Sequence, residues 1–165
     1  MQFPHKIAPC LWFDTQGEAA AQFYCGIFPN SRITEIGRYP DNDHAAHRDR
    51  AGTAMTVAFE LAGQSFTALN GGPHFKFTEA ISLQVYTDDQ AETDHYWNAL
   101  GAGCDPKTQQ CGWLKDRYGL SWQIVPKAVI DILGGPDRAR AAKAMAAVMQ
   151  MKNIDIAAVQ KAAAA

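Results

Sequence analysis

The feature that most constrains this chain is an internal repeat of element order: a strand, a helix and three strands. Apolar spacing predicts this order first at 7–13, 17–28, 31–39, 53–61 and 65–70. The same order returns at 79–87, at about 89–100, within 101–110, and at 111–117 and 120–125. The two copies align at an offset of about 73 residues, so that Pro9–Asp14 lies over Ser82–Thr87. A module this small cannot bury its sheet alone, so the two copies are expected to pair.

The repeat predicts an α+β fold in which two βαβββ modules form one curved, mostly antiparallel sheet. The domain is expected to span residues 1–126, with modules at about 1–73 and 74–126. Asp14 or Thr15 is expected to cap the helix at 17–28, and Asp88 or Asp89 the helix that ends near Leu100. Residues 127–165 are predicted to form a helical extension, in which Asp137 and Asp155 cap the later helices. The apolar side chains of this extension, including Met145 and Met149, are interpreted as packing residues.

Charge and composition exclude several classes of function. The 165 residues carry a formal net charge of −2, which speaks against nucleic acid as a partner. No apolar run approaches the length of a membrane span, and the N-terminus lacks a signal-peptide pattern, so we expect a cytoplasmic protein without a membrane partner. The four cysteines form no C-x-x-C pair and are expected to be free thiols.

Several motifs are similar to those of a known family. They are Ile7–Asp14, Glu18–Tyr24, Phe28–Ser31, Phe59–Gln64, Leu69–Pro73, Cys111–Asp116, Gly119–Pro126 and Met149–Ile156. With them the sequence resembles the vicinal oxygen chelate superfamily of glyoxalase, bleomycin-resistance and dioxygenase proteins. Within it the chain is most similar to the PhnB-like branch, whose domain is labelled 3-demethylubiquinone-9 3-methyltransferase. The resemblance implies a glyoxalase-like fold over almost the whole chain, and a homodimer.

The resemblance also implies where a metal would bind, because metalloenzymes of the superfamily carry His or Glu on the first and last strand of each module. Those positions fall at Pro9, Ser82 and Gln123, and within Phe66–Asn70, where no residue is a His, Cys or carboxylate. A divalent metal needs several such ligands, so we expect no cofactor, with a divalent metal as the alternative. No glycine-rich loop follows a first strand, so the methyltransferase label gains no support, and catalytic residues are left unassigned.

Strand alternation indicates a ligand-binding face. If Ser82 faces the cup that the resemblance implies, Gln84 and Tyr86 do too, while Ile81, Leu83 and Val85 face the helices. If Gln123 faces the cup, Ser121 and Val125 do too, while Leu120, Trp122 and Ile124 enter the core. An ordinary antiparallel sheet with one solvent-exposed face gives the same alternation of polar and apolar residues. The predicted ligand-binding residues are Leu11, Asn70, Ser82, Gln84, Tyr86, Trp113 and Gln123. For Asn70, which precedes Gly-Gly-Pro, turn chemistry is the alternative.

Two other groups of residues have both a chemical and a plain interpretation. His44 and His47, with Asp41, Asp43 and Asp49 nearby, could gather a metal or simply form a solvated loop. Cys10 and Cys111 could act as nucleophiles, but both are predicted to be small buried hydrophobic residues.

Three functions remain open from the sequence. The first is a protein that binds a small organic molecule in the cup without metal. The second is a metal-dependent isomerase, lyase or transferase of the glyoxalase type. The third is a structural homodimer whose cup is vestigial or filled by the C-terminal helices.

Overall fold

The computed structural model describes residues 5–42, 44, 47 and 49–165. The chain divides into two compact units, Met1–Lys76 and Phe77–Ala165, and each is described by itself. The division falls within a few residues of the boundary that the repeat predicts.

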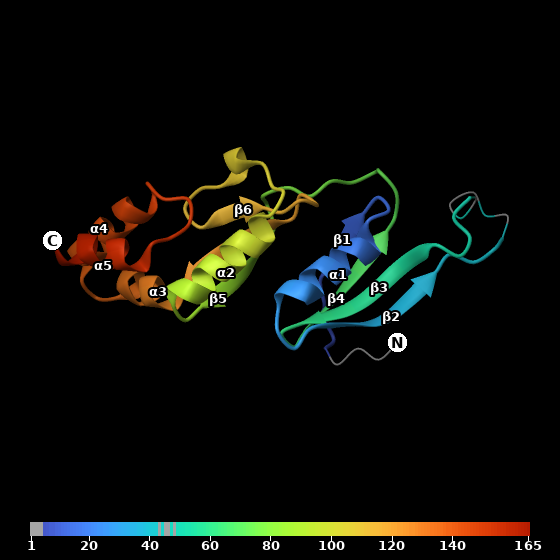
Figure 1. Ribbon diagram of the computed structural model, residues 1–165, viewed down its shortest axis with the longest axis horizontal. Helices are drawn as coiled ribbons and strands as arrows, with labels where there is room; N and C mark the ends of the chain where they lie inside the picture. The colour runs from blue at the N-terminus through green and yellow to red at the C-terminus, as the bar shows by residue number, and fades with distance from the viewer. Residues whose placement is uncertain (1–4, 43, 45–46, 48) are drawn as a thin grey trace. The chain divides into compact units, whose positions relative to one another are not determined.

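The first unit is a four-stranded sheet with a helix on one face. Its strands lie in the order β1 (Cys10–Phe13), β4 (Gln64–Asn70), β3 (Ala54–Leu61) and β2 (Arg32–Arg38). β1 pairs parallel with β4, and the other pairs are antiparallel. The helix α1 (Gly17–Ile27) lies across β3 and β4 (Figure 1). The core between them includes Tyr24 stacked on Phe59, and Phe59 stacked on Phe66.

The second unit repeats this plan with one strand fewer. Its strands lie in the order β5 (Ser82–Thr87), β7 (Ser121–Pro126) and β6 (Trp113–Lys115). β5 pairs parallel with β7, and β6 pairs antiparallel with β7. The helix α2 (Gln90–Gly101) contacts all three strands (Figure 1).

The strand predicted within residues 101–110 is wrong. A short 3-10 helix, η1 (Pro106–Thr108), takes its place. Asp105 accepts a hydrogen bond from the backbone N–H of Lys107, and Pro106 has the fixed φ that suits a first helical position, so this segment turns rather than extends. The second module is therefore βαββ and not βαβββ. The α+β class and the glyoxalase-like plan are confirmed, whereas one curved sheet made by both modules stays a prediction.

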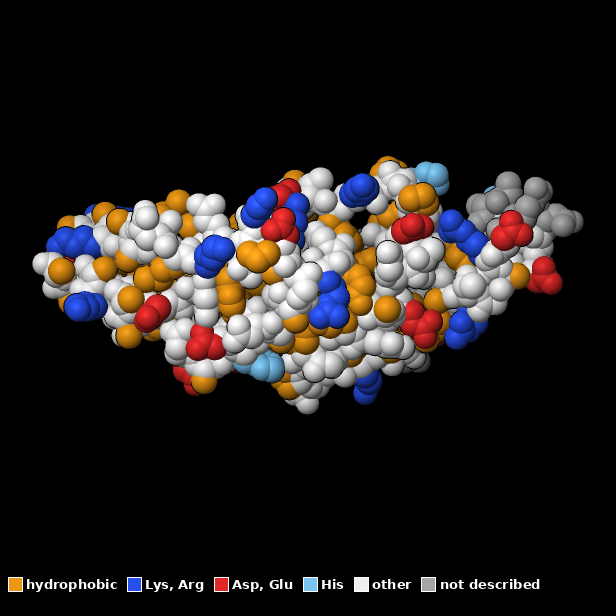
Figure 2. Space-filling view, turned by 45° about the horizontal axis from the view of Figure 1, so that its top comes forward, with side chains coloured by type: hydrophobic (Ala, Val, Ile, Leu, Met, Phe, Trp, Pro, Cys, Tyr) orange, Lys and Arg blue, Asp and Glu red, His pale blue; other side chains and the backbone are white. Residues whose placement is uncertain are grey.

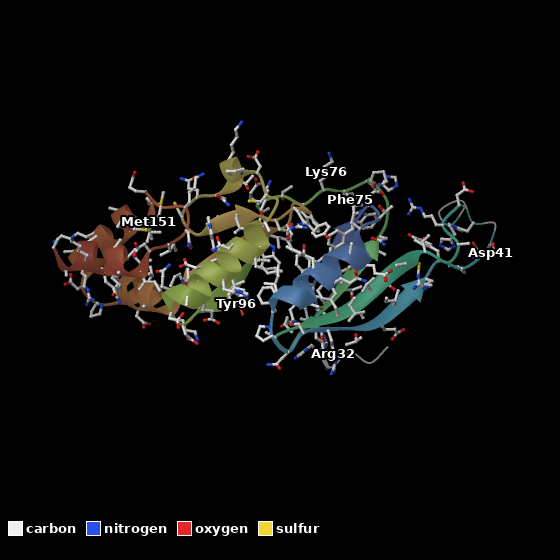
Figure 3. The ribbon with its side chains drawn as sticks, viewed as in Figure 1. Arg32, Asp41, Phe75, Lys76, Tyr96 and Met151 are labelled. Atoms are coloured by element: carbon white, nitrogen blue, oxygen red, sulfur yellow. The ribbon has the colours of Figure 1, made fainter. Side chains whose placement is uncertain are left out.

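Three helices follow the second sheet and belong to the same unit. They are α3 (Lys127–Gly134), α4 (Arg138–Val148) and α5 (Ile156–Ala164). Their cluster of buried residues contains Val129, Ala144 and Val159, exposed by 3% or less. Met151, which follows α4 (Figure 3), accepts a hydrogen bond from the Cys111 N–H at 2.8 Å. Lys152 accepts one from the Gly112 N–H at 2.8 Å. The extension is therefore fastened to the second module by its backbone.

Three of the five α-helices in the described ranges begin at a capping side chain, whereas α1 and α3 do not. Asp89, Asp137 and Asp155 cap α2, α4 and α5, as predicted. The prediction that Asp14 or Thr15 caps α1 is wrong, because its N-cap is Gln16, which makes no side-chain cap. The backbone N–H of Gly17 instead donates to Oδ1 of Asn70, at 2.7 Å.

Candidate functional site

One face of the β5–β7–β6 sheet is polar and the other forms the core. Leu114, Trp122 and Ile124 point into the core and are at most 2% exposed. The opposite surface, here called the polar face, is formed by the side chains of Ser82, Gln84, Tyr86, Trp113, Lys115, Ser121, Gln123 and Val125. This is the alternation that the sequence predicts. Ile81 departs from it, because it precedes β5 and is 71% exposed instead of facing a helix.

Four predicted ligand-binding residues form a hydrogen-bonded row on the polar face. The Tyr86 hydroxyl donates to Oε1 of Gln84 at 2.7 Å, and Nε2 of Gln84 donates to Oε1 of Gln123 at 3.4 Å. Nε2 of Gln123 donates to Oγ of Ser82 at 2.6 Å. Each hydrogen bond runs in the direction from Tyr86 to Ser82. The hydroxyl hydrogen of Ser82 and a lone pair on the hydroxyl oxygen of Tyr86 are therefore not used within the row. The row can therefore offer a ligand a donor at one end and an acceptor at the other.

The strand register places Trp113 and Lys115 beside this row. Trp113 lies opposite Gln123, and Lys115 lies opposite Ser121, which in turn lies opposite Ser82. Residues in register share a face of the sheet, so the half-buried Trp113 ring borders the amide row. Lys115 was missing from the sequence-based site because the pairing of β6 with β7 was not known. Trp113 and Lys115 are alternate residues of β6, but a strand of three residues is too short for its alternation to identify Lys115.

A cavity of about 490 Å³ opens at the Lys115 end of the polar face. Its lining includes Glu79, Lys107, Trp113, Lys115 and Ser121. Nζ of Lys115 forms an ion pair with Oε1 of Glu79 at 2.5 Å, and the hydrogen bond from Lys115 holds the pKa of the Glu79 carboxyl below its ordinary value. Ser121 is 1% exposed, and among the described residues its hydroxyl has no hydrogen-bond partner.

Removing the Ser121 hydroxyl should not weaken the fold. A buried polar group without a partner costs roughly 1–3 kcal/mol, so Ser121→Ala is expected to leave the free energy of unfolding unchanged or to raise it by up to about 1 kcal/mol. Urea denaturation followed by circular dichroism measures this. Thr93→Val is the matched control, because the buried Thr93 hydroxyl donates to the Asp89 carbonyl at 2.7 Å. The control should lower stability by about 1 kcal/mol. A loss of that size in Ser121→Ala would contradict the unpartnered hydroxyl.

Leu11, a predicted ligand-binding residue, faces the core of the first unit, whereas Gln84 lies on the exposed face of the second sheet. Leu11 is 6% exposed and lies in register with Ala68, whose side chain faces Gly17 of α1. The offset of about 73 residues pairs Leu11 with Gln84, but the two side chains lie on opposite faces of their sheets. The first strands of the two modules therefore correspond at an offset that differs by one residue. The side chains of β1 on the face away from α1 are those of Cys10 and Trp12.

Asn70 acts as a structural anchor in the first unit. Its Oδ1 accepts from Gly17, and its Nδ2 donates to the Ala54 carbonyl at 2.9 Å. Its own carbonyl accepts from the Tyr39 hydroxyl. The side chain is 6% exposed and ties the start of α1 to two strands, which favours the structural interpretation of this residue.

The cysteines and the loop histidines are the residues for which the sequence also allows a chemical interpretation. All four cysteines are free thiols. Cys10 is exposed, contrary to the prediction of a buried residue, and partial desolvation raises the pKa of its thiol, which disfavours the nucleophilic thiolate. The His44 and His47 rings lie 4.9 Å apart, and Nδ1 of His47 contacts Oδ1 of Asn42, while Asp43 lies outside the described residues. Within the described part of the chain, no three His, Cys, Asp or Glu side chains gather as metal ligands.

On the face shown in Figure 2, basic and acidic side chains are interspersed among apolar and neutral ones. None of the helices in the described ranges combines the length and the hydrophobicity that a membrane span needs.

Comparison with known proteins gives a family. The model described as 3-demethylubiquinone-9 3-methyltransferase matches residues 5–125. The solved structure of the PhnB protein from Bacillus cereus is 32% identical, with a TM-score of 0.62 over 74% of this chain and 99% of that chain. A Pseudomonas aeruginosa protein, 20% identical over 74% of this chain and 97% of its own, shares the fold with a TM-score of 0.57. No functionally curated protein matches.

The two modules and their sheets define a glyoxalase-like α+β protein. The chain belongs to the 3-demethylubiquinone-9 3-methyltransferase family, and its likeness to the PhnB protein confirms the PhnB-like resemblance in sequence. The helices of the C-terminal extension lie beyond the matched residues.

Proposed function

We propose that this protein binds a small polar organic molecule on the polar face of its second module. The observation that carries the proposal is the row of hydrogen bonds from Tyr86 through Gln84 and Gln123 to Ser82. The row has a free donor and a free acceptor at its ends, and Trp113 borders it. Ligand sites combine apolar walls with a few polar groups that fix orientation, and this face supplies both.

The proposed binding does not use the metal of the superfamily. The Gln123 oxygen already accepts a hydrogen bond from Gln84, and its nitrogen donates to Ser82. Amide and hydroxyl groups are weak ligands for divalent metals, which select imidazole, thiolate or carboxylate groups. The donor set therefore does not fit a resident divalent metal, and it favours direct hydrogen bonds to an organic ligand.

A thermal-shift screen of polar metabolites and divalent metals tests this function. A ligand at 100 times its Kd should stabilise the folded state by about 2.7 kcal/mol, which raises the melting temperature. Gln123→Leu should abolish the shift, because it removes the centre of the row, whereas Gln150→Leu, an exposed amide on another part of the unit, should preserve it. The metals alone should give no shift. A metabolite shift that survives Gln123→Leu, or stabilisation by a stoichiometric metal, would refute the proposal.

The same proposal includes a homodimer. Ile7, Phe75 and Ile81 are 87%, 66% and 71% exposed, which leaves apolar surface for a second copy to cover. Phe75 lies in the connection after β4 (Figure 3). Sedimentation equilibrium is expected to give twice the chain mass of 18.0 kDa. A monomer at micromolar concentration would contradict this part of the proposal.

A further inference from the structure

We propose that the ligand of the polar face carries a carboxylate, and that this carboxylate binds between Lys115 and Ser121. The inference rests on the proposed function and adds a chemical class to it. It starts from the cavity of about 490 Å³ at that end of the face, which contains a positive charge and an unused hydroxyl.

The Ser121 hydroxyl is the first observation. Its oxygen is buried and has no partner among the described residues, and Ser121 is one of the residues that line the cavity. Buried hydroxyl groups normally have a hydrogen-bond partner, because leaving one unpaired is costly. A ligand oxygen in the cavity would accept the hydroxyl hydrogen and remove that cost.

Lys115 is the second observation. It lies directly opposite Ser121 across the β6–β7 pair, so its side chain leaves the sheet on the same face. The side chain of Lys115 is 26% exposed, and its ammonium already holds a carboxylate, that of Glu79. Glu79 itself is 67% exposed and precedes β5, so it can move into water without disturbing the sheet. The Glu79 carboxylate thus occupies the place that a ligand carboxylate would take.

The remaining lining matches an organic acid better than a neutral ligand or a cation. Lys107 adds a second positive charge against the single charge of Glu79, and the Trp113 ring supplies an apolar wall. A carboxylate with an apolar body would meet an ammonium, a hydroxyl donor and an aromatic ring together. Hydrogen bonds between charged partners are about twice as strong as neutral ones, so charge should dominate recognition here.

The test compares three carboxylates with their primary amides: acetate with acetamide, benzoate with benzamide, and phenylacetate with phenylacetamide. Each is titrated into the ¹⁵N-labelled full chain, and the backbone signals of Lys115 and Ser121 and the indole signal of Trp113 are followed. At least one carboxylate should bind about tenfold more tightly than its amide. Lys115→Met should remove this preference, and Lys143→Met, an exposed lysine on α4, should keep it.

The variant Glu79→Gln gives a second test, because this substitution is not expected to unfold the protein and should increase binding rather than abolish it. This exposed substitution removes the competing carboxylate, so carboxylate affinity should rise several-fold. A structural role for Glu79 predicts the opposite sign or no effect. Equal binding of every carboxylate and its amide, or an unchanged preference in Lys115→Met, would overturn the inference. If the carboxylate preference is absent but polar metabolites still perturb the signals of Gln84 and Gln123, only the inference about the carboxylate fails. If no compound binds at the polar face, the proposed function fails as well.

Discussion

Asp116→Ala is expected to lower the free energy of unfolding by about 3–5 kcal/mol. Oδ2 of Asp116 accepts from the Trp122 indole N–H at 2.8 Å. Oδ1 accepts from the backbone N–H groups of Tyr118 and Leu120, at 2.8 and 3.1 Å. Asp116 is 4% exposed and Trp122 and Leu120 are each 2% exposed, so alanine would leave buried donors without partners. Urea denaturation followed by far-ultraviolet circular dichroism gives the free energy.

Asp116→Asn is the matched control for this prediction. The asparagine oxygen can keep the two backbone hydrogen bonds, but its amide nitrogen then faces the indole donor, so the loss should be smaller, at about 1–3 kcal/mol. A loss below about 1 kcal/mol for Asp116→Ala would mean that the carboxylate does not hold the β6–β7 turn together.

Gly112→Ala is expected to cost about 2–4 kcal/mol, because it combines backbone strain with a steric clash. Gly112 has a φ of +81°, and a Cβ there would lie 2.8 Å from the Ile124 carbonyl oxygen and 2.9 Å from Cδ1 of Ile154. Its own N–H and carbonyl bond to Lys152 and to Ile124, so the glycine joins β7 to the C-terminal extension. Thermal and urea unfolding measure the loss, and faster amide exchange at Gly112 would show that the extension loosens.

Gly119→Ala separates the two causes. Gly119 has a φ of +87°, but a Cβ would meet nothing within 4 Å. This control therefore carries only the backbone strain, about 1–2 kcal/mol. Equal losses in the two variants would contradict the close packing of the extension against Gly112.

The sequence predicts the elements well where apolar alternation and capping residues agree. The polar and core faces of β5 and β7 follow from alternation alone, and three aspartate caps follow from position. Contacts between distant residues could not be predicted. The backbone N–H of Gly17 at the start of α1 donates to the side chain of Asn70, which is 53 residues away in the chain. The strand expected before residue 110 became η1, because Asp105 and Pro106 favour a tight turn.

The candidate site was predicted in part. Ser82, Gln84, Tyr86 and Gln123 form one row, since period-2 alternation fixes their face. The alignment of the modules sets Leu11 over Gln84, but a shift of one residue reverses the direction of the side chain, and Leu11 is buried. The Lys115–Ser121 pair depends on the register of β6, which three residues cannot specify by pattern. Asp116 carried a local signal, an aspartate two residues before the Tyr118–Gly119 turn, that indicates turn chemistry.

The central claim is that the polar face of the second module binds a small organic ligand. Nuclear magnetic resonance of the ¹⁵N-labelled chain, titrated with the strongest stabiliser from the thermal-shift screen, tests it most directly. We predict saturable shifts in the side-chain amide signals of Gln84 and Gln123 and in the indole signal of Trp113. Saturable shifts confined to the first unit or to α3–α5, with these three signals unmoved, would contradict the claim.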